Sequence, residues 1–104
     1  MHIRMDPSYL DKLEAAWELE TGFLGRLREG IFDPVLYGDF VTTLMSIQLD
    51  EHELLSQRFV TLLWFICPFM ERQTERVAET IDVEEYALKR ENIERQLERI
   101  LGLP

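Results

Sequence analysis

FVTLLWFICPFM, residues 59–70, is the stretch around which this chain must fold, because almost all of its side chains are apolar. On a helix, residues 53–79 place most of their apolar side chains on one wide face, opposite a narrow polar stripe. This pattern predicts a central helix that the rest of the chain covers. A membrane span is excluded, since a helix of this apolar run is about 18 Å long, against ~30 Å of hydrocarbon.

Length and charge limit the possible classes of protein. The chain has 104 residues, which predicts a single helical domain, 1–104, with residues 1–5 as a candidate disordered leader and Met5 as an alternative initiator. Its 20 acidic and 11 basic residues give a net charge of −9, which argues against nucleic-acid binding. The single cysteine, Cys67, excludes an internal disulfide and suits a reducing compartment. With no signal-like stretch at the amino end, we expect a cytoplasmic protein that has no membrane partner.

Asp-Pro pairs predict two helix starts. A first helix is predicted from Pro7 to about Glu29, and Gly22 and Gly25 are expected to break or bend it near Thr21, since each glycine weakens a helix by ~1 kcal/mol relative to alanine.

The second Asp-Pro pair, Asp33 and Pro34, predicts a helix that ends near Gln48. A last helix follows Asp82, which with Glu85 has the spacing of a capping box.

The central helix has its own start signal and a predicted kink. Asp50 caps it, with Glu53 in the capping-box position, and it extends to Glu79. Pro68 removes the hydrogen bond to the carbonyl of Trp64, so a kink is expected near that residue. The fold class is therefore all-α, a bundle of four to five helices around a kinked central helix.

The apolar positions of these helices form the predicted core. We expect Phe65 to be among the buried residues, where its replacement by alanine would cost ~3–5 kcal/mol. The predicted buried side chains are Leu13, Trp17, Phe40, Leu44, Leu62, Phe65, Ile66, Phe69, Ile93 and Leu97.

Catalysis is not predicted. The only histidines are His2, near the amino end, and His52, interpreted as a surface residue, and no Glu-x-x-His pair offers the ligands of a di-metal site. No cofactor or metal is expected. Cys67 followed by Pro68 is compatible with thiolate ligation of haem, but a small buried hydrophobe that reacts slowly is the preferred interpretation.

Acidic residues are concentrated in one part of the sequence. Residues 31–56 contain five acids and no Lys or Arg, which predicts an electronegative face for a basic partner, unless these acids serve only as helix caps and for solubility. Trp64 falls on the polar stripe, so it is either an exposed anchor or core covered by the last helix. The candidate partner-binding residues are Asp33, Tyr37, Asp39, Asp50, Glu51, Glu53 and Trp64.

In size, acidity and helix content the chain resembles the helical immunity proteins of bacterial toxin systems, with no motif in common. The resemblance implies a non-catalytic antitoxin that neutralises a basic toxin through an acidic helical surface. Two alternatives remain: a bundle that binds haem or a small ligand through Cys67, and a helical subunit that dimerises through an apolar face.

Overall fold

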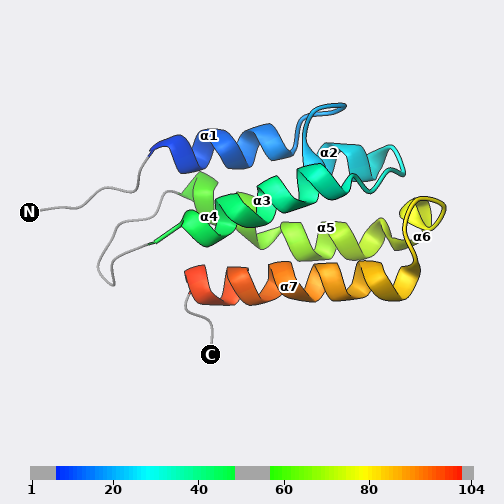
Figure 1. Ribbon diagram of the computed structural model, residues 1–104. Helices are drawn as coiled ribbons and strands as arrows, with labels where there is room; N and C mark the ends of the chain where they lie inside the picture. The colour runs from blue at the N-terminus through cyan, green and yellow to red at the C-terminus, as the bar shows by residue number, and fades with distance from the viewer. Residues whose placement is uncertain (1–6, 49–56, 102–104) are drawn as a thin grey trace, which may run out of the picture.

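The computed structural model describes residues 7–48 and 57–101, in which all regular secondary structure is helical (Figure 1). The predicted all-α class is confirmed. The described residues contain more and shorter helices than the four to five predicted. They are α1 Pro7–Ala16, α2 Phe23–Arg28, α3 Pro34–Ser46, α4 Gln57–Trp64, α5 Ile66–Arg72, α6 Thr74–Val77 and α7 Val83–Leu101.

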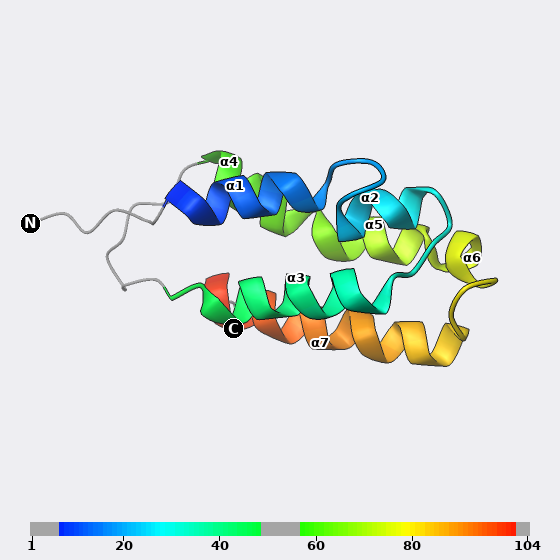
Figure 2. The same cartoon turned by 45° about the horizontal axis from the view of Figure 1, so that its top comes forward.

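The helices make four passes along the long axis of the molecule (Figures 1 and 2). The first pass is α1 with α2, the second α3, the third α4 with α5 and α6, and the fourth α7. The first pass packs on α3 and on the third pass, and α7 packs on α3 and on α5 and α6. Each pass thus occupies a corner of the bundle, with α3 opposite α4 and α5. The stretch predicted to be central lies at a corner and keeps one side facing outward.

The first predicted helix is two helices, and the break between them, residues 17–22, contains Thr21 as expected. α1 ends at Ala16, and α2 begins only at Phe23. The glycines have a steric role here, because a Cβ on Gly22 would collide with the carbonyl oxygen of Ala15 and one on Gly25 with that of Glu18. Two glycines therefore allow α2 to approach the end of α1 closely.

The predicted caps of α3 and α7 are confirmed. The carboxylate of Asp33 accepts hydrogen bonds from the backbone N–H groups of Val35 and Leu36, at 2.9 and 3.1 Å. The carboxylate of Asp82 accepts hydrogen bonds from the backbone N–H groups of Glu84 and Glu85, at 3.1 and 3.2 Å. The cap and capping box predicted at Asp50 and Glu53 lie outside the described residues.

The third pass contains three helices where one kinked helix was expected. Phe65 forms a turn between α4 and α5; its backbone keeps right-handed helical angles (φ −83°, ψ −7°), and its N–H donates to the carbonyl of Thr61 at 3.2 Å. Pro68 lies in the first turn of α5, where a missing N–H disturbs a helix least. A second turn at Gln73 separates α5 from the short α6.

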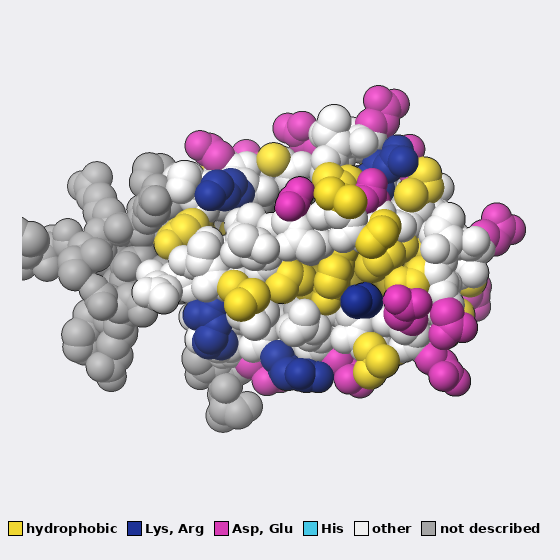
Figure 3. Space-filling model, viewed as in Figure 1, with side chains coloured by type: hydrophobic (Ala, Val, Ile, Leu, Met, Phe, Trp, Pro, Cys, Tyr) yellow, Lys and Arg dark blue, Asp and Glu magenta, His cyan; other side chains and the backbone are white. Residues whose placement is uncertain are grey.

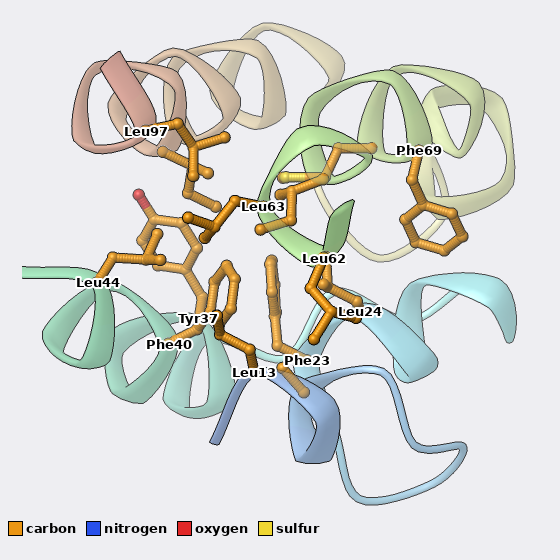
Figure 4. Packing of buried hydrophobic residues seen from close by; sticks show 14 of the residues in the cluster. Leu13, Phe23, Leu24, Tyr37, Phe40, Leu44, Leu62, Leu63, Phe69 and Leu97 are labelled. Carbon is orange, nitrogen blue, oxygen red and sulfur yellow. The ribbon is translucent and has the colours of Figure 1, made fainter. Parts of the chain in front are cut away.

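Aromatic side chains from α2, α3 and the loop between them form a cluster within a largely aliphatic core (Figure 4). The ring of Phe23 stacks on Phe40 at 5.5 Å and meets Phe32 and Tyr37 edge-on, each at 5.6 Å. On the other side, the buried hydroxyl of Tyr86 donates to the carbonyl of Met70 at 2.7 Å, which ties α7 to α5.

Most of the predicted core is confirmed, with one clear error. Trp17 is only partly buried, and it packs edge-on against Phe69 at 4.8 Å. Phe65 was predicted to be buried but is 51% exposed, because the third pass lies at a corner and this residue faces outward. The predicted residues that are buried are Leu13, Phe40, Leu44, Leu62, Ile66, Phe69, Ile93 and Leu97.

Candidate functional site

The apolar stretch of residues 59–70 divides into an inward and an outward set. The inward set recurs at three- and four-residue intervals and is buried: Phe59, Leu62, Leu63, Ile66, Phe69 and Met70. Trp64 is 58% exposed, Phe65 is 51% exposed and Pro68 is also exposed. We call these three residues the aromatic patch. Folding of the monomer explains why the inward set is apolar but gives no reason for the aromatic patch.

A groove lies beside the aromatic patch, between the junction of α4 with α5 and the C-terminal half of α7. We call it the α4–α7 groove; its volume is about 240 Å³. Its lining is Leu63, Trp64, Cys67, Pro68, Glu94, Leu97, Glu98 and Leu101. Aliphatic and aromatic side chains make up most of this lining, and the two glutamates, both exposed, bring negative charge to it.

A second, more open depression of about 420 Å³ adjoins the aromatic patch, and no residue of α7 lines it. Phe65 and Pro68 line it together with Trp64, Glu71 and Arg72. The aromatic patch therefore separates two hollows, and each hollow has at least one carboxylate beside it. Apolar centres with charged borders are typical of protein-binding surfaces.

Cys67 lies in the wall of the α4–α7 groove and is half-buried, where full burial was expected. Burial raises the pKa of its thiol to about 11, the negative charges of Glu94 and Glu98 add to the effect, and Arg90 opposes it. The net effect still favours the neutral thiol.

Cys67 is therefore expected to react slowly with alkylating reagents. At pH 8 its thiolate fraction should be about 100-fold below that of a cysteine with the ordinary pKa of 9.0. The labelling rate should rise about tenfold per pH unit and continue to rise above pH 9, until the pKa of about 11 is reached. Stopped-flow labelling of the native protein from pH 7 to 10 measures this profile, with the urea-unfolded chain as control. Native and unfolded chains that label at equal rates would contradict the assignment.

Of the five acids predicted to form an acidic face, the structure describes two, Asp33 and Asp39. Asp33 caps α3, and Asp39 is exposed on α3, at the corner opposite the aromatic patch. Asp50, Glu51 and Glu53 lie outside the described residues. The structure therefore does not bring Asp39 together with Trp64.

Tyr37, predicted as an anchor for the partner, is buried in the core. Its hydroxyl donates to the carbonyl of Lys89 at 3.3 Å and accepts from the amide of Asn92 at 3.0 Å. In Figure 4 its phenol points from α3 toward α7. On the face shown in Figure 3, apolar side chains follow the seam between these two helices, and charged groups of both signs lie around them. This face is not uniformly acidic.

The sequence analysis named Trp64 as a candidate and did not select its neighbours. Phe65 was assigned to the core, and Glu94 and Glu98 were not among the candidate residues. One signal was present in the sequence, because a helix that is apolar on every side must be buried on every side or bind something.

The described residues, 7–48 and 57–101, contain neither a candidate metal-ligand group nor a candidate membrane-spanning helix. In these residues no group of three His, Cys, Asp or Glu side chains could hold a metal ion. Likewise, none of the helices described there has the length and apolar character needed to cross a bilayer.

Comparisons with protein-family models, with curated proteins and with solved structures found no match to this chain. The interpretation of the site therefore rests on its own residues.

Proposed function

We propose that this protein is a non-catalytic binding protein, which inhibits a basic protein partner through the aromatic patch. The observation that carries the proposal is the exposure of two adjacent large aromatic side chains, Trp64 and Phe65, on a helical surface. Tryptophan is enriched among the few residues that dominate binding energy at interfaces, and aromatic side chains in general are enriched there. The aromatic patch loses its contact with water if a partner covers it.

The shape of the site favours a protein partner over a bound small molecule, because the second hollow, although about 420 Å³ in volume, is open and lined by only five residues. The α4–α7 groove, at about 240 Å³, is smaller than the ~300–1,000 Å³ of typical ligand pockets. The raised pKa of Cys67 also disfavours the thiolate that would ligate haem. Haem binding through this cysteine is the weaker candidate.

The charge of the site favours a basic partner over a second copy of this chain. Glu71 lies beside the aromatic patch together with Arg72, and Glu94 and Glu98 line the groove, so three acids and one base border the site. A symmetric dimer through this surface would bring these acids close to their own copies, at a cost in repulsion. A positively charged surface would instead be attracted, and the net charge of −9 would speed the encounter.

The type of function follows the resemblance to helical immunity proteins, which neutralise basic toxins in the bacterial cytoplasm. A small acidic helical domain that presents an aromatic patch beside carboxylates suits this task. In this proposal the binding surface is centred on α4 and α5, and Asp39 on α3 contributes only to long-range attraction.

Replacement of Trp64 by alanine tests the proposal. Trp64→Ala should weaken partner binding by at least ~30-fold, as expected for a central tryptophan worth 2 kcal/mol or more, and should leave the fold intact because the side chain is exposed. The partner is captured from the source cell with the wild-type chain, and its affinity is then measured by calorimetry.

Leu88→Ala is the matched control, because Leu88 is also a large exposed apolar residue, 62% exposed, but lies on α7 outside both hollows. It should change the affinity by less than about twofold. Equal losses from Trp64→Ala and Leu88→Ala would mean that the partner binds elsewhere.

A further inference from the structure

We infer that the α4–α7 groove receives one large apolar side chain of the partner, with a Lys or Arg of the same partner segment lying over Glu94 and Glu98. The inference rests on the proposed function and specifies its partner: a helical segment that carries an apolar anchor and, one turn away, a cation. Binding of this kind places a few side chains of an amphipathic helix in an apolar groove.

The shape and lining of the groove suit an apolar anchor. Its volume of about 240 Å³ lies below the usual range for small-molecule pockets, so a single bulky side chain is a better fit than a cofactor. Buried Leu63 and Leu97 and half-buried Leu101 line it, and exposed Trp64 lies beside them. An anchor inserted there would exchange water for aliphatic contacts while the indole of Trp64 covers its side.

The acids of the groove are free to receive a cation. Glu94 and Glu98 are one turn apart on α7, and among the described residues neither has an ion-pair or hydrogen-bond partner. Two like charges at this spacing repel each other slightly, and a cation placed between them would relieve this repulsion.

The nearest basic residues of α7 are directed elsewhere. Arg95 pairs with Glu91 at 4.0 Å, and Arg99 donates to the carbonyls of Leu44 and Ile47 at the end of α3, at 2.8 and 3.0 Å. Arg99 therefore holds α7 against α3 and leaves the groove acids unneutralised. Arg90 acts on Cys67 at longer range but does not line the groove.

Cys67 provides the measurement, because the only cysteine of the chain lies in the wall of the groove. An occupant should shield its thiol from a small alkylating reagent. The probes are three short helical synthetic peptides added to the full-length protein. The first carries a Phe and, one turn away, a Lys; the second replaces the Phe by Ala, and the third replaces the Lys by Glu.

The first peptide should slow Cys67 labelling and bind at least ~10-fold more tightly than either of the others, as measured by fluorescence anisotropy. The double variant Glu94→Gln with Glu98→Gln should reduce the preference for Lys over Glu to about threefold or less. Glu84→Gln with Glu85→Gln, exposed on α7 outside the groove, is the matched control and should keep the preference.

Equal binding of the three peptides, or labelling that is unchanged at the highest peptide concentration, would overturn the inference. Protection of Cys67 that grows with protein concentration in the absence of peptide would also overturn it, because a second copy would then be the occupant. The proposed function fails separately, when Trp64→Ala leaves the affinity for the captured partner unchanged. A failed peptide test alongside a Trp64→Ala variant that loses the partner would therefore reject only the groove as the anchor site.

Discussion

Gly25→Ala is expected to lower the free energy of unfolding by at least ~2 kcal/mol, although helix propensity alone predicts that alanine would raise it. Gly25 lies in α2, where alanine is ordinarily favoured by ~1 kcal/mol. Here the added Cβ would collide with the backbone of Glu18, which belongs to the turn that follows α1. Backbone cannot move aside as a flexible side chain can, so α2 would be forced away from α1 and the core contacts of Phe23 would be disturbed. Urea denaturation followed by circular dichroism measures the loss.

Gly38→Ala is the matched control for this prediction. Gly38 also lies within a helix, α3, but it is exposed and a Cβ there would meet nothing within 4 Å. This variant should stabilise the protein by ~0.5–1 kcal/mol, because alanine restricts the unfolded chain and favours the helix. If both glycine variants stabilise the protein, α2 does not approach the end of α1 as closely as the structure shows.

The helix starts and breaks could be predicted from the sequence because their causes are local. A carboxylate at the N-cap needs only the next three backbone N–H groups, so Asp33 and Asp82 identified the starts of α3 and α7. The break near Thr21 was also expected, but its length and the steric role of Gly25 were not. The close approach of two backbones depends on tertiary packing, which one residue's propensity does not encode.

The arrangement of the helices could not be predicted in the same way. Residues 59–70 are apolar on every side, and periodicity does not tell which sides the other helices cover. Trp64 and Phe65 face outward because α7 packs on α5 from one side only and α3 lies at the opposite corner. The outward direction reversed the assignment of Phe65 and showed that Trp64 is exposed and not part of the core.

The candidate site was predicted only in part for a related reason. Residue counts identified an excess of acids in residues 31–56, but counts do not show which carboxylates are already used. Asp33 is engaged in capping α3 and Tyr37 in the core, whereas Glu94 and Glu98 have free carboxylates beside an apolar groove. A binding surface depends on apolar and charged groups that lie together in space.

Phe59→Ala is expected to cost ~3–5 kcal/mol of unfolding free energy, and Phe65→Ala no more than about 1 kcal/mol. The two phenylalanines lie in the same apolar stretch, but Phe59 has no exposed surface and Phe65 is 51% exposed. Loss of the first ring leaves a cavity among α1, α4 and the rest of the core, whereas water fills the space left by the second. Urea denaturation of the two variants under identical conditions makes the comparison, and equal losses would contradict the outward placement of Phe65.

The same Phe65→Ala variant should lose affinity for the partner while it keeps its fold. Phe65 lies between Trp64 and Pro68 in the aromatic patch, so in the complex its ring should be covered as completely as Phe59 is in the monomer. We expect binding to weaken by about tenfold or more. This factor corresponds to about 1.4 kcal/mol or more of binding free energy, which is what removal of a well-covered aromatic side chain costs at an interface. Calorimetry with the captured partner measures this, and the thermal melt of the variant shows whether it is folded. If the Phe65→Ala variant is folded and binds the partner with normal affinity, the aromatic patch is not the binding surface.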